Sequence, residues 1–411
     1  MSESAVGSSA VVAPHDLIRS RAVPWTTRRC FAALLGLRHG SLDIVLPDGR
    51  VTRFPGQAPG PHARLTVHSY RFVKRLVAGD VGFAEGYIAG EWSSDDLVAL
   101  LGVLAANQHL IDRFAANPLV RTVQMARHWL NRNSREGSRR NIHAHYDLGN
   151  DFYAAFLDSS MTYSAGLDVA DDLEAAQHRK YQAVAAAAGI GPQHHVLEIG
   201  CGWGGFAEYA ARHIGCRVTA LTISRAQFDH ATARIAAAGL DDRVTIKFCD
   251  YRDEPGLYDR VVSIEMFEAV GEAYWQGFFD VVQARLKPGG RAALQVITIR
   301  EDLFPRYRRE MDFIRRYIFP GGMLPTPTHL RDLIARNGFA PLSYRAFGKD
   351  YAATCRLWRD RFEANWPEIQ GRGFDARFQR IWRYYLAYCE AGFSSGTIDV
   401  CHIAFGKGGR A

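Results

Sequence analysis

A glycine-rich turn near the middle of the chain has the residue types that let a backbone approach a nucleotide-like ligand. His195–Gly205 (HVLEIGCGWGG) is an apolar strand that runs into Gly200, Gly202 and Gly204 before an expected helix. Together with Gly205, this spacing formally matches the dinucleotide fingerprint. The fingerprint alone is weak evidence, so the ligand has to be identified from the acids around it.

Two acidic positions separate the candidate ligands. A dinucleotide site needs an acid about 20 residues further on to hold a ribose, but Val218–Ser224 (VTALTIS) contains none. Glu198 precedes the first glycine, where a carboxylate repels a pyrophosphate and attracts an ammonium group. The pattern therefore favours S-adenosylmethionine, with Asp250 placed to hydrogen-bond an adenine edge. The alternative for Glu198 is an acid that caps a helix or bonds a loop.

Strands that alternate with helices must position these residues. The expected helices include Arg225–Ala238 and Ala273–Leu286. The expected strands are His195–Ile199, Arg217–Thr222, Val244–Phe248, Arg260–Ile264 and Arg291–Ile299. This alternation predicts an α/β fold with a doubly wound, Rossmann-like parallel sheet.

The start of the chain follows a different pattern. Gly40–Phe54 alternates apolar and polar residues around a Pro-Asp-Gly turn, which indicates a hairpin. Val67–Ala78 and Asp95–Ala106 are expected to be short helices. The predicted division is a small α+β domain (1–120), an Arg-rich linker (121–144) and a doubly wound α/β domain that carries the glycine turn (145–411).

Composition excludes several classes of protein. The chain is 47% hydrophobic and 23% charged, as in folded globular proteins. Its seven cysteines show no CxxC or Cys/His spacing, so no metal site is expected and a reducing cytoplasm fits. The longest apolar stretch, Leu97–Ala106, is too short to cross a bilayer, and the first residues do not resemble a signal peptide. Membrane contact would have to be peripheral.

The positive charge is unevenly distributed. The net charge is +7, and the whole excess lies in residues 1–140, because basic and acidic residues balance in the remainder. A basic module beside a neutral one fits a nucleic acid or an anionic phospholipid surface. A modest charge on a surface without such a partner fits equally well.

Several motifs together resemble the cyclopropane-fatty-acyl-phospholipid synthase family, which includes the mycolic acid cyclopropane synthases. The similarity covers roughly residues 140–405. Its motifs are HYDLGNDF (145–152), MTYS (161–164), LEIGCGWGG (197–205), LTISRAQ (221–227), DRVVSIEMFEAVG (259–271), FPGGMLP (319–325) and KDYAA (349–353). The resemblance implies a class I methyltransferase fold with S-adenosylmethionine as cofactor.

The same resemblance implies which residues contact the cofactor and what the enzyme acts on. The implied contacts are Tyr163, Ser164, Gly200, Gly202, Thr222, Ile223, Gln227 and Tyr251. The implied substrate is an unsaturated acyl chain of a membrane phospholipid, and the implied default product is a cyclopropane fatty acid. An N-terminal domain that dimerises the enzyme and meets the bilayer makes an anionic membrane at the inner face a better partner than nucleic acid.

The residues expected to remove a proton depart from the family pattern. In the family, a bound bicarbonate is held by a Cys, a Glu, a His, a backbone group of an Ile and a Tyr. Here Glu268 and Tyr351 are retained, whereas Ala165 and Gln295 stand at the Cys and His positions. Either bicarbonate binds in an altered cradle, or Glu268, with or without Glu265, is itself the base. Glu265 alone is expected to be solvated or to bond a loop.

The role of Cys389, the reaction product and two competing functions stay open. Cys389 matches a family cysteine regarded as catalytic, but no step of the expected reaction needs a thiolate, so a structural role is favoured. The product is a cyclopropane or, in the alternative, a methyl- or methylene-branched chain. The competing functions are methylation of a soluble small molecule and a non-catalytic lipid-binding paralogue.

Overall fold

The computed structural model describes residues 11–110 and 148–408, and these form two compact units. Unit 1 comprises the described part of Met1–Met125 together with Met311–Arg316 and Phe374–Ser395. Unit 2 comprises the described part of Ala126–Glu310, then Tyr317–Gly373, then the described part of Gly396–Ala411. The units differ from the predicted domains, because two later segments of the chain belong with the N-terminal residues. The predicted linker (121–144) lies outside the described residues.

Unit 1 is built on a four-stranded sheet with the order β2-β1-β3-β4. Strands β1 and β2 form the predicted hairpin, and β3 adds to β1 in parallel. The strands are β1 (His39–Val45), β2 (Val51–Pro55), β3 (Ala58–Val67) and β4 (Trp92–Ser93). The early helices are α1 (Pro14–Arg19), α2 (Trp25–Leu34), α3 (Phe72–Arg75), η1 (Leu76–Ala78), α4 (Gly79–Ile88) and α5 (Leu97–Ala106).

Helix α19 (Ala376–Ser395) completes unit 1, where it packs against α5. The carboxylate of Asp80 on α4 joins the separate parts of the unit: it accepts hydrogen bonds from the Phe313 N–H at 3.1 Å and from the Tyr388 hydroxyl at 3.2 Å. Helix α5 begins two residues later than expected, because the Asp96 side chain caps it by accepting from the Ala99 N–H. Among the described residues, no helix is long and apolar enough to cross a bilayer.

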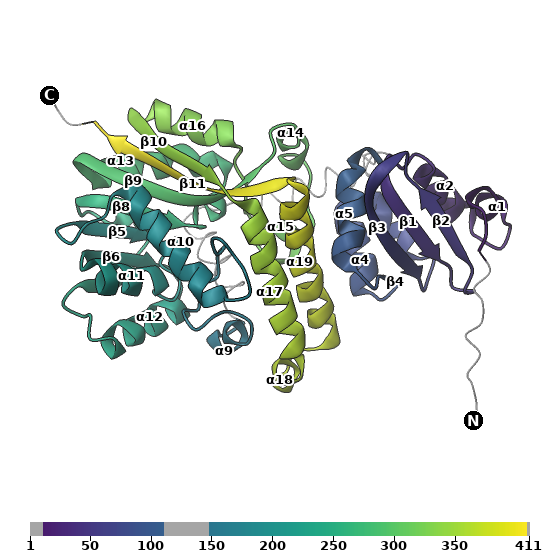
Figure 1. Ribbon diagram of the computed structural model, residues 1–411, viewed down its shortest axis with the longest axis horizontal. Coiled ribbons are helices and arrows are strands. Elements are labelled where there is room, and N and C mark those ends of the chain that lie inside the picture. The colour runs from purple at the N-terminus through teal and green to yellow at the C-terminus, as the bar shows by residue number, and fades with distance from the viewer. Residues whose placement is uncertain (1–10, 111–147, 409–411) are drawn as a thin grey trace. The chain divides into compact units, whose positions relative to one another are not determined.

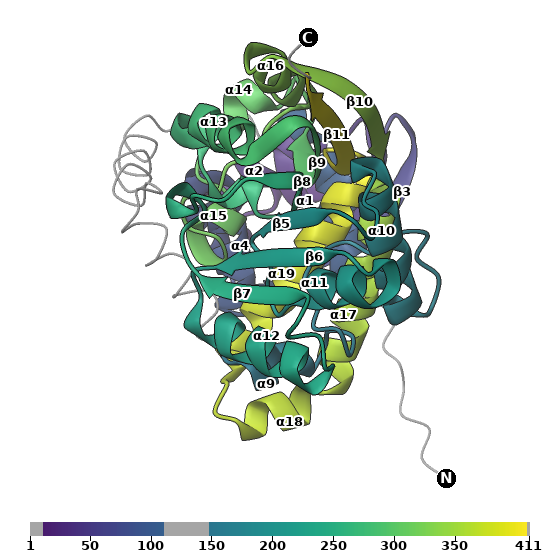
Figure 2. The same cartoon turned by 90° about the vertical axis from the view of Figure 1, so that its left-hand side faces the viewer.

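Unit 2 contains a seven-stranded sheet with the order β10-β11-β9-β8-β5-β6-β7. Figure 2 shows the parallel part of this sheet, in which β9, β8, β5, β6 and β7 follow one another. Strand β11 pairs antiparallel with both β9 and β10. The strands are β5 (His195–Ile199), β6 (Arg217–Thr222), β7 (Val244–Phe248), β8 (Tyr258–Ile264), β9 (Leu286–Ile299), β10 (Phe339–Ala346) and β11 (Ile398–Lys407).

The helices of unit 2 connect and cover these strands (Figure 1). Side-chain caps at Asp172, Ser224 and Thr326 fix where three of them begin. The longer helices are α10 (Leu173–Ala188), α12 (Arg225–Ala237), α13 (Trp275–Arg285), α16 (Pro327–Arg336) and α17 (Gly348–Ala364). The shorter ones are α9 (Asn150–Ala154), α11 (Gly205–Tyr209), η2 (Ala210–Ile214), η3 (Tyr251–Asp253), η4 (Phe267–Ala269), η5 (Glu272–Tyr274), α14 (Phe304–Tyr307), α15 (Phe313–Tyr317, shared with unit 1) and α18 (Trp366–Gly371).

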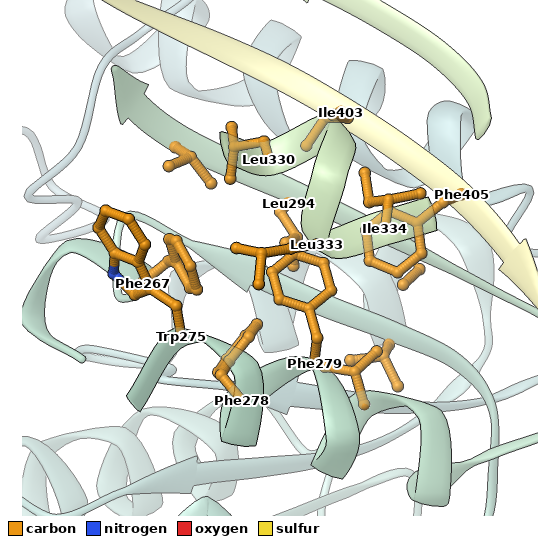
Figure 3. Packing of buried hydrophobic residues seen from close by; sticks show 14 of the residues in the cluster. Phe267, Trp275, Phe278, Phe279, Leu294, Leu330, Leu333, Ile334, Ile403 and Phe405 are labelled. Carbon is orange, nitrogen blue, oxygen red and sulfur yellow. The ribbon is translucent and has the colours of Figure 1, made fainter. Parts of the chain in front are cut away.

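The doubly wound fold predicted from the sequence is confirmed, and an aromatic cluster holds one layer of it together. Phe267 stacks on Trp275 with ring centroids 5.8 Å apart, and Phe278 and Phe279 of α13 pack edge-on against Phe267 (Figure 3). Each buried ring of this kind removes a large apolar area from water, so the cluster stabilises this layer. Because Phe267 lies in the segment that carries Glu265 and Glu268, the core also anchors that segment.

Candidate active site

The glycine turn lies at the C-terminal end of β5, where α/β sheets bind ligands. The N–H groups of Gly200 and Cys201 both donate to the Leu221 carbonyl, which ties the turn to β6. Gly200 has a φ of +84°, and a Cβ there would lie 2.7 Å from Cγ of Met266. Gly204 has a φ of +86° and precedes α11. Glycine is therefore required in this turn by both backbone conformation and space.

Glu198 brings a buried carboxylate to this turn. It is 2% exposed, and its Oε2 atom has no hydrogen-bond partner among the described residues. Burial raises the pKa of Glu198 to about 8, and the positive charge of buried Lys180 opposes that rise. A buried carboxylate with one orphaned oxygen is costly unless a cation binds to it. This observation fits the ammonium group of S-adenosylmethionine, and it disfavours a simple capping role for Glu198.

The end of β6 and the start of α12 form a polar corner beside the glycine turn. The hydroxyl of Thr222 donates to Oε1 of Gln227 at 2.9 Å, and both side chains are buried. Ser224 caps α12 by accepting from the Gln227 N–H, and Ile223 lies between these residues. Gln227 thus keeps its amide N–H groups available for a hydroxyl-bearing ligand.

Asp250 and Tyr251 follow β7, at the same end of the sheet. Both carboxylate oxygens of Asp250 accept from the Arg252 guanidinium, at 2.8 and 2.5 Å. To bind an adenine edge as expected, Asp250 therefore has to accept a further hydrogen bond while it keeps this ion pair. The ring of Tyr251 lies edge-on to Phe278, with centroids 5.5 Å apart, so that the core fixes its position.

Tyr163 and Ser164 belong to a loop that several side chains hold in place. The Tyr163 ring lies among other aromatic rings, including Trp358 at 5.3 Å and Phe319 at 6.4 Å between centroids. The Ser164 hydroxyl accepts from Nζ of Lys180 at 2.7 Å. Lys180 is 0% exposed, and burial lowers its pKa to about 8. The loop is thus fixed by a fully buried cation that sequence reasoning did not identify.

A second carboxylate, Glu265, lies at the centre of a hydrogen-bond network. Its Oε1 accepts from the Ala165 N–H at 2.8 Å and from Nε2 of Gln295 at 2.7 Å. Its Oε2 accepts from the Tyr351 hydroxyl at 2.5 Å. Glu265 also has a φ of +50°, which is rare for a residue other than glycine and marks sites where strain serves a function. Glu265 does bond a loop, as expected, but the expectation that it is merely a solvated or loop-bonding acid is incomplete.

Glu268 lies close to this network but is held differently. Its Oε1 accepts from the Ile297 N–H, while its Oε2 is buried without a partner among the described residues. Burial, followed by the charge of Glu265, raises the pKa of Glu268 to about 8. Two neighbouring buried carboxylates do not both ionise readily. We therefore assign the charge to Glu265, which has three donors, and the proton to Glu268.

The network does not provide a binding site for bicarbonate, which was one of the two alternatives that the sequence left open. Its implied donors were the Ile297 backbone, the Tyr351 hydroxyl and the side chain at Gln295. The first donates to Glu268 and the other two donate to Glu265. Since two carboxylates of the chain already take these hydrogen bonds, the residues present do not fit an added bicarbonate, and no step is assigned to one.

The remaining predicted site residue belongs to the other unit. Cys389 is on α19 and belongs to unit 1, whereas all the other predicted site residues belong to unit 2. The residues that sequence reasoning missed are Lys180 and His402, which donates to Gln295. Both are buried charged or titratable side chains on elements of apolar pattern, and that is the one signal by which the sequence marks them.

Comparison with known proteins identifies relatives of this chain. A sequence model described as mycolic acid cyclopropane synthetase matches residues 133–403. The chain is 40% identical to "Tuberculostearic acid methyltransferase UfaA1" of Mycobacterium tuberculosis, covering 88% of this chain and 87% of that protein. It is 36% identical to the "Cyclopropane-fatty-acyl-phospholipid synthase" of Escherichia coli K12, covering 86% of this chain and 89% of that protein.

Solved structures agree with the sequence comparison. The mycolic acid cyclopropane synthase CmaA1, solved with SAH and CTAB, is 29% identical with a TM-score of 0.62, covering 66% of this chain and 98% of that one. An N-methyltransferase solved with SAH has a TM-score of 0.62 at 18% identity, which shows the shared fold. The chain therefore belongs to the mycolic acid cyclopropane synthetase family and is an S-adenosylmethionine-dependent methyltransferase of lipid acyl chains.

Proposed function

We propose that the enzyme methylates the double bond of an unsaturated acyl chain of a membrane phospholipid, and that Glu265 then removes a proton to leave a methylene-branched chain. The observation that carries this proposal is the Glu265 network, in which a side-chain carboxylate accepts hydrogen bonds from Ala165, Gln295 and Tyr351.

The reaction balances with the cofactor and the chain alone. The cofactor supplies an electrophilic methyl group on a sulfonium. When the alkene attacks this methyl group, one alkene carbon gains a C–C bond, the S–CH₃ bond breaks and the neighbouring carbon becomes a cation. A hydride shift moves the cation to the methyl-bearing carbon, and loss of a methyl proton to Glu265 forms the C=CH₂ group. A saturated methyl branch would need a reductant in addition, so it is not part of this proposal.

We assign the cofactor contacts to one end of the sheet. Glu198 would hold the ammonium group with its orphaned oxygen, and the turn at Gly200, Gly202 and Gly204 would lie against the cofactor backbone. The ribose would bind at Thr222, Ile223 and Gln227, and the adenine at Asp250 and Tyr251. Tyr163 and Ser164 would close the site. The aromatic rings around Tyr163 exclude water and present ring faces that stabilise a cation.

Two carboxylates and a phenol complete the catalytic group. Glu265 is the base because its three donors favour the ionised form even though burial raises its pKa. Glu268 keeps its proton and so adds no second negative charge. Tyr351 holds Oε2 of Glu265 and orients the carboxylate. Cys389 is given no step, since the proton transfer needs no thiolate.

Two observations favour a branched product over the cyclopropane that the family resemblance implies by default. The first is that Glu265 and Glu268 together accept the hydrogen bonds expected for bicarbonate. The second is the similarity, at 40% identity, to a protein named as a tuberculostearic acid methyltransferase and not as a cyclopropane synthase. The cyclopropane remains the competing product, because relatives at 36% identity are named as cyclopropane synthases.

Lipid analysis distinguishes the two products, which have the same mass. Cells that express the protein are grown with methyl-labelled methionine, and their phospholipid acyl chains are analysed by fragmentation mass spectrometry before and after mild hydrogenation. We expect labelled chains that are one CH₂ heavier and that take up hydrogen. Labelled chains that resist hydrogenation would identify a cyclopropane and overturn the branched product. Label in a water-soluble acceptor alone would overturn the lipid substrate.

A surface on unit 1 supports peripheral binding to an anionic membrane face. Trp25 is 61% exposed on α2, and the Arg29 guanidinium lies 5.7 Å from its ring centroid. The other face of α2 is buried against the sheet, where the Phe31 ring centroid lies 6.4 Å from that of Phe54 on β2. Between residues 11 and 38, five arginines make no ion pair with any residue in the described part of the chain. They are Arg19, Arg21, Arg28, Arg29 and Arg38.

An exposed tryptophan beside unpaired arginines is typical of a protein that rests on anionic headgroups, since the ring enters the interface and the guanidiniums meet phosphates. We therefore place the membrane contact on α1 and α2, at the cytoplasmic face. The homodimer implied by the family resemblance is a separate proposal, and the mass of the purified protein in solution tests it.

A further inference from the structure

A buried histidine lies directly behind the Glu265 network and takes no part in the reaction as described so far. His402 is on β11 and is 4% exposed. Its Nε2 lies 2.8 Å from Oε1 of Gln295, which is 0% exposed on the neighbouring strand β9. His402 and Gln295 are paired residues in the antiparallel register of β9 and β11, so the sheet itself sets this contact.

The direction of this hydrogen bond follows from the partners of Gln295. The nitrogen of its side-chain amide reaches Oε1 of Glu265 at 2.7 Å and the Ala165 carbonyl at 3.4 Å. A carbonyl oxygen only accepts, so the amide nitrogen has to be on that side. The amide oxygen therefore faces His402, and His402 has to donate from a protonated Nε2.

The surroundings of His402 keep it neutral and in one place. Its ring lies 4.6 Å from the ring of Phe347 between centroids. Burial lowers its pKa to about 3, and the positive charges of Lys180 and Arg345 act in the same direction. A neutral imidazole with one N–H is a donor of fixed direction throughout the range in which the enzyme works.

We propose that His402 is a positioning residue of the methyl transfer, which holds the Gln295 amide in the one orientation that donates to Glu265. Without the His402 donor, the Gln295 amide is free to turn its oxygen toward Glu265. Two oxygens would then face each other, and the base would lose both a hydrogen bond and its orientation. The proposal rests on the assignment of Glu265 as the base.

The test compares His402→Leu, which removes the donor, with His402→Gln, whose amide N–H can replace it. We expect His402→Leu to lower kcat by about tenfold or more, a part of the ~10²–10⁴-fold that a general base contributes, while the Kd for S-adenosylmethionine stays unchanged. His402→Gln should recover most of the loss. His195→Leu is the matched control, because His195 bonds Thr219 at 2.9 Å at the opposite end of β5 and should leave kcat unchanged.

The pH profile of kcat separates positioning from a general loss of structure. A lost donor raises the pKa of Glu265, so the acidic limb of the profile should move to higher pH in His402→Leu and return in His402→Gln. The other ionisable groups that face Glu265 are Lys180 on α10, Glu268 on η4 and Tyr351 on α17, and all are unchanged in these variants. A fall in kcat without a shift of this limb would overturn the proposal.

A double variant tests whether His402 acts through Gln295. In the Gln295→Leu background, His402→Leu should cause no further loss, and additive losses would overturn the proposed route. If His402→Leu does not fold, His402→Asn, whose side chain is too short to reach Gln295, takes its place. Failure of the proposed function would appear as an inactive wild-type enzyme, whereas an active wild type with an equally active His402→Leu variant refutes this inference alone.

Discussion

The binding of S-adenosylmethionine should depend on pH through Glu198. Burial raises the pKa of this carboxyl group to about 8, so in the ligand-free enzyme it carries a proton at neutral pH. The ammonium group of the cofactor favours the ionised form, and the pKa falls when the cofactor binds. Binding therefore releases a proton below about pH 8, and the affinity rises with pH up to that value.

The size of the effect follows from the linkage between protons and ligand. Well below the pKa of the free group, each unit of pH changes the apparent Kd by about tenfold, and near the pKa the change levels off, so that Kd falls about 50-fold between about pH 6 and pH 8. Lys180 also has a pKa lowered to about 8, and it interacts with Glu198. The released proton therefore has to be assigned by substitution.

Calorimetric titration of the full-length protein in buffers of different ionisation enthalpy measures both Kd and the number of protons released. The Glu198→Gln variant should bind more weakly and with a smaller dependence on pH, because Lys180 and the cofactor's own amino group are then the remaining titrating groups. If Kd of the wild type does not change with pH and no proton is released, the assignment of Glu198 to the ammonium group is refuted. An unchanged slope in Glu198→Gln would refute it as well.

Two further predictions concern the base and the membrane. Glu265→Gln should lower turnover by ~10²–10⁴-fold with unchanged cofactor binding. Glu268→Gln should lower turnover by less than about tenfold, because that side chain is already neutral. Single-turnover assays compare the two variants, and a larger loss of rate in Glu268→Gln than in Glu265→Gln would make Glu268 the base. Trp25→Ala and Arg29→Ala should each weaken binding to anionic vesicles, Arg29→Ala by about fivefold at low salt and less at high salt. Phe248→Ala, which removes another exposed ring, is the control; equal losses in all three variants would contradict the assigned surface.

The sequence predicted the centre of unit 2 closely because local signals agree there. The bounds of β5, β6 and β7 are those expected, and α12 begins at Arg225 behind its serine cap. The expected Val67–Ala78 helix is right only in part: Val67 ends β3, and the helical residues are Phe72–Ala78. Strand β3 was missed because its burial pattern is exposed over the first half and gives no alternation.

The sequence predicts a site residue when a single segment identifies its role. It does not predict a role that depends on partners far apart in the sequence. Glu198 and the glycines can be identified from a single segment. Glu265 gains its role from Ala165, Gln295 and Tyr351, which come from a loop, a strand and a helix far apart in sequence. Only the folded chain shows that these groups share one carboxylate.

The composition of unit 1 also dictates the order in which the protein can form during synthesis. Helix α19 contributes buried Trp382, Tyr384, Tyr385 and Leu386, yet it leaves the ribosome after nearly the whole of unit 2. Unit 1 therefore cannot complete its fold when its N-terminal strands and α5 are synthesised, because α19 is made only after most of the methyltransferase sheet. A chain cut between residues 110 and 148 would leave α5 without its cover in one fragment and an apolar α19 in the other. The two units are thus inseparable as genetic modules, although each has its own sheet.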